Sequence, residues 1–131
     1  MPTDYAALTA HAAARTALDL AQANLSRAEE DVRTAAVDLN NCQAALDRCL
    51  ADALNGNATA QEVLSHCYSE KRTSAETVRA SVKRLLAADA ALDAATAHEA
   101  TTRAAVEQAA QEAHNPSNRT RDASRALRLM L

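Results

Sequence analysis

The side chains of this chain with the widest chemistry are its cysteines and one neighbouring histidine, because both groups bind zinc and thiols can also be oxidised. His66 directly precedes Cys67, and Glu62 and Glu70 flank His66 by four residues on either side. A zinc site needs about four ligands within tetrahedral reach, but His66 falls outside the positions that would face a neighbouring helix. We therefore expect no metal and no cofactor. The chain has three cysteines, which are Cys42, Cys49 and Cys67.

All three thiols fall where a helix would bury a small apolar side chain, so free, buried cysteines are the simplest expectation. That reading favours a reduced, cytoplasmic setting. A Cys49–Cys67 disulfide is an alternative, although the two positions are offset by about 4.5 Å along the helix axis. A metal or redox protein that uses the three cysteines and His66 is therefore one function class to test, and the sequence leaves the redox state of the thiols open.

Catalytic patterns are missing from the sequence. A ferritin-like di-iron centre needs Glu-x-x-His motifs on two helices, and this chain has none. With a single glycine it also lacks a glycine-rich phosphate loop. Nucleophilic catalysis would need a thiol or hydroxyl beside a base in a concave pocket, which two packed helices do not offer. We expect no enzymatic activity.

A cluster of arginines near the C-terminus is the other group with binding chemistry. Pro116 separates residues 115–131 from the preceding helix, because the residue before a proline is driven out of the α region. We expect a short, basic, amphipathic helix that binds a protein partner. Its predicted contact residues are Arg119, Arg121, Arg125, Leu127 and Arg128. Either this helix binds an acidic surface or it folds back on the rest of the chain.

The elements that carry these residues are defined by two heptad series on either side of Gly56. Large residues recur every seven positions, and small residues recur at the companion spacing. We name the large series a and the small series d, and both together the seam. The large series is Leu18, Leu25, Val32, Leu39, Leu46, then Leu64, Val78, Leu85, Leu92, Val106. The small series is Ala14, Ala21, Ala28, Ala35, Cys42, Cys49, then Cys67, Ser74, Ser81, Ala88, Ala95, Thr102, Ala109.

A fold at residues 55–57 places large residues opposite small ones, as an antiparallel coiled coil requires. The predicted pairs are Leu46 with Cys67, Leu39 with Ser74, Val32 with Ser81, Leu25 with Ala88 and Leu18 with Ala95. The fold class is therefore all-α, a long antiparallel two-helix coiled-coil hairpin over residues 1–114, with helices at about 4–54 and 60–114. Ionisable residues at a positions, namely His11, Lys71 and Glu99, mark where the packing thins or where a partner adds charge.

The turn between the helices has clear start and stop signals. Gly56, between Asn55 and Asn57, suits the left-handed conformation that ends a helix. Thr59 and Glu62 have capping-box spacing at the start of the second helix. The same seam pairing would form in a closed hairpin and in a dimer that exchanges its second helix, and the sequence does not distinguish them.

Apolar residues at the e positions of the heptads form a further edge, which we call the e edge. A monomeric hairpin would leave this edge in water, so we expect a homodimer or higher oligomer, such as a four-helix bundle. The self-association residues are Leu8, Leu50, Tyr68 and Val82. The net charge of −3 argues against nucleic acid, and charge-free stretches of about ten residues are too short to span a membrane.

The function expected from these patterns is that of a non-enzymatic assembly or scaffold protein with a basic docking helix. The alternative is a secretion or export chaperone or adaptor that binds a partner helix along the e edge. The alanine-rich, lysine-poor composition is typical of a GC-rich bacterial or phage genome. The partner, the cellular process and the stoichiometry are not encoded in any pattern we find.

Overall fold

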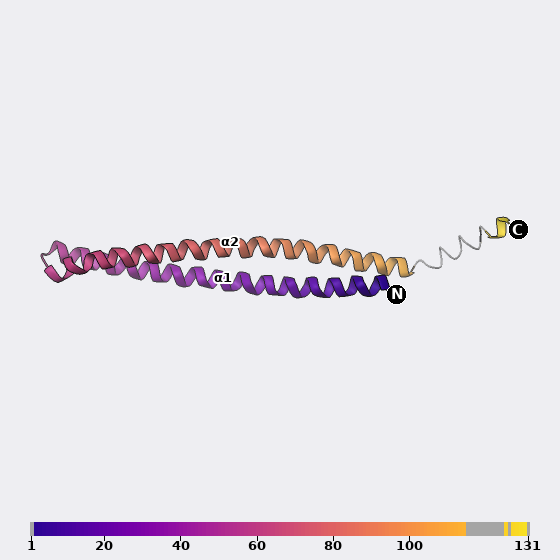
Figure 1. Ribbon diagram of the computed structural model, residues 1–131, viewed down its shortest axis with the longest axis horizontal. Helices are drawn as coiled ribbons and strands as arrows, with labels where there is room; N and C mark the ends of the chain where they lie inside the picture. Colours follow the sequence, from indigo (N-terminus) through magenta and orange to yellow (C-terminus); the bar gives the residue numbers. More distant parts are fainter. Residues whose placement is uncertain (1, 115–124, 126, 131) are drawn as a thin grey trace. The chain divides into compact units, whose positions relative to one another are not determined.

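The computed structural model describes residues 2–114, 125 and 127–130, and the side chains of residues 2–4 are excluded from the description. Two long helices account for most of it: α1 spans Pro2–Leu54 and α2 spans Ala58–His114. Residues 125 and 127–130 are also helical, and the described part of the chain contains no strand. The rest of the predicted helix over residues 115–131 lies outside the described residues, so the helix over this whole range stays a prediction. The sequence-based expectation of an all-α protein with two long, packed helices is confirmed (Figure 1).

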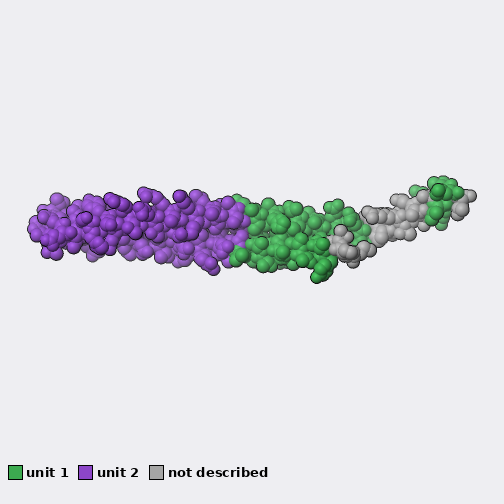
Figure 2. All heavy atoms as spheres, viewed as in Figure 1, with its two compact units in different colours: residues 1–20, 93–131 green, residues 21–92 purple. Residues whose placement is uncertain are grey.

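The chain divides into two compact units, coloured separately in Figure 2. Unit 2 comprises Ala21–Leu92, in which the later part of α1 packs against the first part of α2 across the turn that joins them. Unit 1 comprises Met1–Leu20 and Asp93–Leu131, in which the beginning of α1 packs against the later part of α2. Each unit therefore has its own segment of the seam.

The turn in unit 2 ends α1 through a Schellman motif. Gly56 has a φ of 88°, in the left-handed region that favours glycine. The Gly56 amide donates to the carbonyl of Ala53 at 3.1 Å, and the Asn57 amide donates to the carbonyl of Asp52 at 3.0 Å. These two bonds satisfy carbonyls that the end of a helix leaves without partners. The predicted role of Gly56 is confirmed.

The cap of α2 differs from the predicted capping box. The Oδ1 atom of Asn57 accepts hydrogen bonds from the backbone amides of Thr59 at 3.0 Å and Ala60 at 3.2 Å. The helix begins at Ala58, so Thr59 already lies inside it and Asn57 is the N-cap. Asparagine caps a helix as well as threonine or better. With Asn57 as the cap, α2 can begin at the next residue, which keeps the turn short. The predicted cap at Thr59 was wrong for this reason.

The seam is buried at the positions that the heptads predict. The small residues Ala14, Ala21, Ala28 and Ala35 are buried, whereas the three cysteines and most of the leucines and valines of the a series are half-buried. Among the residues whose burial is described, the buried ones are Ala14, Ala21, Ala28, Ala35, Leu46, Ala60, Ser81 and Thr102. Every one of them lies at an a or d position. The core is therefore continuous along each unit but thin, since only Leu46 combines large size with full burial.

The two buried hydroxyl groups of the seam both have hydrogen-bond partners. Ser81 Oγ accepts from Arg84 Nη2 at 3.2 Å, and Thr102 Oγ1 donates to the carbonyl of Glu99 at 2.9 Å. A buried hydroxyl without a partner would destabilise the fold. These contacts explain how the small series tolerates serine and threonine beside alanine. Among the described residues, neither α1 nor α2 contains a stretch long and apolar enough to cross a membrane.

Candidate functional site

Two cysteine side chains meet between the helices within unit 2, Cys49 of α1 and Cys67 of α2. Their Sγ atoms lie 3.0 Å apart, as in a thiol–thiol hydrogen bond. Both cysteines are half-buried and both are free thiols. The hydrogen bond with Cys49, together with partial burial, raises the pKa of the Cys67 thiol above its ordinary value of 9.0. The sequence-based offset along the helix axis did not anticipate so short a contact.

His66 does not join this cysteine pair. Its side chain is 72% exposed, and its Nε2 atom pairs with Glu70 Oε1 at 2.9 Å on the same helix. Within the described residues, no group of three or more histidine, cysteine, aspartate or glutamate side chains could hold a metal ion. The 3.0 Å contact between Cys49 and Cys67 is therefore separate from the His66–Glu70 pair.

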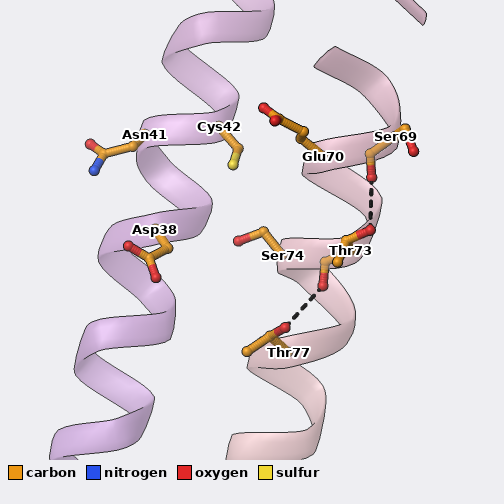
Figure 3. Close-up of a pocket in the computed structure, with 8 residues that line it drawn as sticks. All are labelled: Asp38, Asn41, Cys42, Ser69, Glu70, Thr73, Ser74 and Thr77. Carbon is orange, nitrogen blue, oxygen red and sulfur yellow. Dashed lines mark hydrogen bonds between the residues drawn. The ribbon is translucent and has the colours of Figure 1, made fainter. Parts of the chain in front are cut away.

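A polar groove of about 490 Å³ lies beside the seam of unit 2, close to the third cysteine. Its lining residues are Asp38, Asn41, Cys42, Ser69, Glu70, Thr73, Ser74 and Thr77 (Figure 3). Cys42 and Ser74 are half-buried and extend into the space between the helices in this view. Because both are small d residues, they leave a hollow that a larger pair would fill. The half-buried, charged Lys71 lies within the α2 stretch that forms one wall.

The chemistry of this groove is limited. Thr73 Oγ1 donates to the carbonyl of Ser69 and Thr77 Oγ1 donates to that of Thr73, each at 3.1 Å. Such bonds to the preceding helical turn occupy the hydroxyl protons. The remaining groups are mainly carboxylates and an amide, which do not by themselves activate Cys42 as a nucleophile. We interpret the groove as a packing defect of the seam.

A polar cluster in unit 1 joins two of the seam exceptions. His11 Nε2 donates to Glu99 Oε1 at 3.1 Å across the two helices, and Arg103 Nη2 donates to Glu99 Oε2 at 2.7 Å. The hydrogen bond from His11, reinforced by Arg103, lowers the pKa of the Glu99 carboxyl below its ordinary value of 4.5. Arg103 was not singled out from the sequence, although its position four residues after Glu99 is the usual spacing of a helical ion pair.

The predicted self-association residues differ in exposure. Leu8 in unit 1 is 55% exposed; in unit 2, Tyr68 is 46% and Val82 37% exposed. Leu50 is half-buried. Tyr68 also borders an open hollow of about 650 Å³ on α2, together with Leu64 and Arg72. The e edge therefore presents apolar surface in both units, with Leu50 contributing less than the others.

The predicted docking residues near the C-terminus are only partly described. Arg119 and Arg121 lie outside the described residues. Arg125, Leu127 and Arg128 are helical and exposed, and Leu127 is 62% exposed. Leu129 and Met130 beside them are 83% and 84% exposed, so two further apolar side chains face solvent next to the predicted docking residues. This short stretch combines basic and apolar groups that face solvent.

Comparison of the chain with protein families, with curated proteins and with solved structures gave no match.

Proposed function

We propose that this chain is an antiparallel coiled-coil hairpin that associates with copies of itself, as a four-helix bundle, and serves as a non-enzymatic assembly or scaffold protein. Two contacts support the hairpin. Cys67, predicted level with Leu46, touches Cys49 three residues further along α1. Glu99, predicted level with Ala14, touches His11, three residues earlier on α1. These are the diagonal neighbours expected in one antiparallel register, observed separately in each unit.

The observation that carries self-association is the contrast between a thin core and large exposed apolar side chains. Burial stabilises by about 25 cal/mol per Å² of apolar surface, and the buried apolar residues are alanines apart from Leu46. Apolar side chains larger than alanine lie in solvent elsewhere on both helices. On the e edge, Leu8, Tyr68 and Val82 are 55%, 46% and 37% exposed. A single hairpin of this kind gains little from burial, and a second copy on the e edge would bury much more.

The experiment that tests this proposal is solution mass by light scattering over a hundredfold dilution, with helicity followed by circular dichroism. The informative variant is Tyr68→Glu combined with Val82→Glu, which puts two charges on the e edge. Leu86→Glu is the matched control, because Leu86 is 64% exposed but lies off that edge. We expect the double variant alone to dissociate. A fully helical wild-type monomer at every concentration would refute self-association.

The hollow beside Tyr68 favours a second candidate, an export chaperone or adaptor that binds a partner's helix along the e edge. Helix-in-groove recognition places apolar anchors at spacings of three, four and seven residues into such surfaces. The same dilution experiment separates the two candidates. An adaptor would be a concentration-dependent, loosely folded monomer that gains helicity only with its client.

For the C-terminal segment we propose docking to an acidic protein surface. Arg125 and Arg128 lie three residues apart on exposed helical positions, so both guanidinium groups can meet one acidic patch. A chain truncated before residue 117 should keep its helicity and its self-association but lose its partner. The three free cysteines support a cytoplasmic setting, because thiols stay reduced there.

A further inference from the structure

We propose that Cys49 and Cys67 are a redox modification site, at which a small-molecule disulfide such as oxidised glutathione drives formation of an intrachain Cys49–Cys67 disulfide. The observation behind the proposal is the 3.0 Å separation of the two Sγ atoms. A disulfide bond is about 2.05 Å long, so the sulfur atoms need to approach by only about 1 Å. Side-chain rotation within each helix can supply such a shift.

Access and isolation both favour this pair. Cys49 and Cys67 are half-buried rather than enclosed, so a small oxidant can reach a sulfur atom at the edge of the seam. Cys42 lies one heptad before Cys49 and borders the polar groove opposite Ser74 (Figure 3). Its position separates it from the pair by about 10 Å along α1. The chain therefore contains its own control thiol, with similar burial but a different neighbour.

The chemistry proceeds in two exchange steps. The Cys49 thiolate attacks one sulfur of the oxidant, which forms a mixed disulfide and releases one small thiol. The Cys67 thiolate then attacks Cys49 Sγ, which closes the intrachain bond and releases the second small thiol. The two protein thiols lose two protons and two electrons, and the oxidant gains them to become two thiols. The first step also removes the Cys49 thiol, whose hydrogen bond raises the pKa of Cys67.

The structural consequence follows from the position of the pair around the turn. Residues 49 and 67 enclose the end of α1, the turn at Gly56 and the start of α2. A bond between them ties the two helices covalently beside the turn. Oxidation would therefore fix the closed arrangement of α1 and α2 in unit 2, whereas the reduced chain could open at residues 55–57.

The test uses the full chain, reduced and then exposed to oxidised glutathione, alkylated and digested with trypsin. Cleavage after Arg48 and Lys71 releases residues 49–71, which contain both members of the pair, and residues 34–48 carry Cys42 alone. The expected result is a 49–71 peptide that lacks two hydrogens and resists alkylation. Alkylation of both Cys49 and Cys67, separate glutathione adducts on them, or a bond between two chains would each overturn the proposal.

Single variants sharpen the assignment. Cys42→Ser should form the bond as the wild type does, whereas Cys49→Ser and Cys67→Ser should leave the remaining member as a glutathione adduct. Bond formation that required Cys42 would also overturn the assignment. Because the wild-type peptide is the primary readout, a variant that folds poorly by circular dichroism does not obscure the result.

Discussion

His11 on α1 and Glu99 on α2 both occupy a positions. His11 Nε2 donates a hydrogen bond to Glu99 Oε1 at 3.1 Å, so the two polar side chains are partners between the helices. Their side chains are only 20% and 14% exposed. Arg103 binds the second carboxylate oxygen at 2.7 Å, so both Glu99 oxygens have partners. Two ionisable residues at a positions thus form one matched contact. Such a contact favours a single pairing register, as polar seam residues do in coiled coils.

This contact makes the stability of unit 1 sensitive to acid. The pKa of Glu99 in the folded chain is below its ordinary value of 4.5, so the folded chain binds the proton less readily than the unfolded chain does. The resulting stabilisation is complete above pH 4.5 and disappears as the pH falls through the lower, folded-state pKa. We expect the melting temperature, followed by circular dichroism, to fall over this acidic range.

Glu99→Gln should remove part of that acid dependence and lower the melting temperature at neutral pH. Glu107→Gln is the control, because Glu107 is an exposed residue of the same helix. Identical acid profiles for the wild type and Glu99→Gln would show that the His11–Glu99 contact does not contribute to stability.

Replacement of the one large, fully buried side chain should be the most damaging truncation in the seam. Leu46 is 2% exposed, and leucine-to-alanine changes at buried sites cost about 2–5 kcal/mol. Leu20→Ala is the matched control, since Leu20 is 61% exposed at a c position. Urea unfolding midpoints measure both effects. An equally large loss at Leu20 would mean that another copy of the chain buries this residue.

Substitutions at Gly56 should lower stability through backbone strain rather than through steric clashes. A Cβ atom at Gly56 would meet nothing within 4 Å, so Gly56→Ala is strained only by the positive φ, at about 1–2 kcal/mol. Gly56→Asn should cost less, because asparagine tolerates the left-handed region better. Thermal melts of the two variants rank them. A larger loss for asparagine than for alanine would contradict this account of the turn.

Asn57→Ala should remove the α2 cap, because Asn57 Oδ1 accepts from the amides of Thr59 and Ala60. Loss of an N-cap side chain costs about 1 kcal/mol. Thr59→Ala tests the capping box predicted from the sequence and should cost less. If Thr59→Ala proved the more damaging change in urea unfolding, the cap would lie at Thr59 after all.

The heptads predicted the helical class, the position of the turn and the buried face, because all three depend on patterns that are local in sequence. Burial of Ala14, Ala35, Leu46 and Ser81 follows directly from seven-residue spacing. The cap was misassigned because Asn57 and Thr59 both have capping side chains, and only the length of the turn selects between them. Likewise, the sequence placed His11 and Glu99 in the seam but could not show that they meet.

The heptads left a Cys49–Cys67 contact only as an alternative, because layer spacing considers only distance along the helix axis. Side chains in a helix tilt toward its N-terminus. In the proposed hairpin, Cys49 then leans away from the turn and Cys67 leans toward it, so that the two sulfur atoms converge across the offset. The 3.0 Å contact is therefore a property of side-chain direction, which heptad positions alone do not give.

The same pair can report whether the chain closes on itself or exchanges α2 between copies. Replacement of Asn55, Gly56 and Asn57 by alanine removes the left-handed residue and the α2 cap together, so that one continuous helix becomes favourable. In that arrangement Cys49 would meet Cys67 of a second copy. We expect the triple variant, oxidised with glutathione disulfide, to run as a covalent dimer on a non-reducing gel, whereas the wild type stays a single chain with an internal bond. Monomeric bands from both proteins would show that the seam closes within one chain even without Gly56 and its cap.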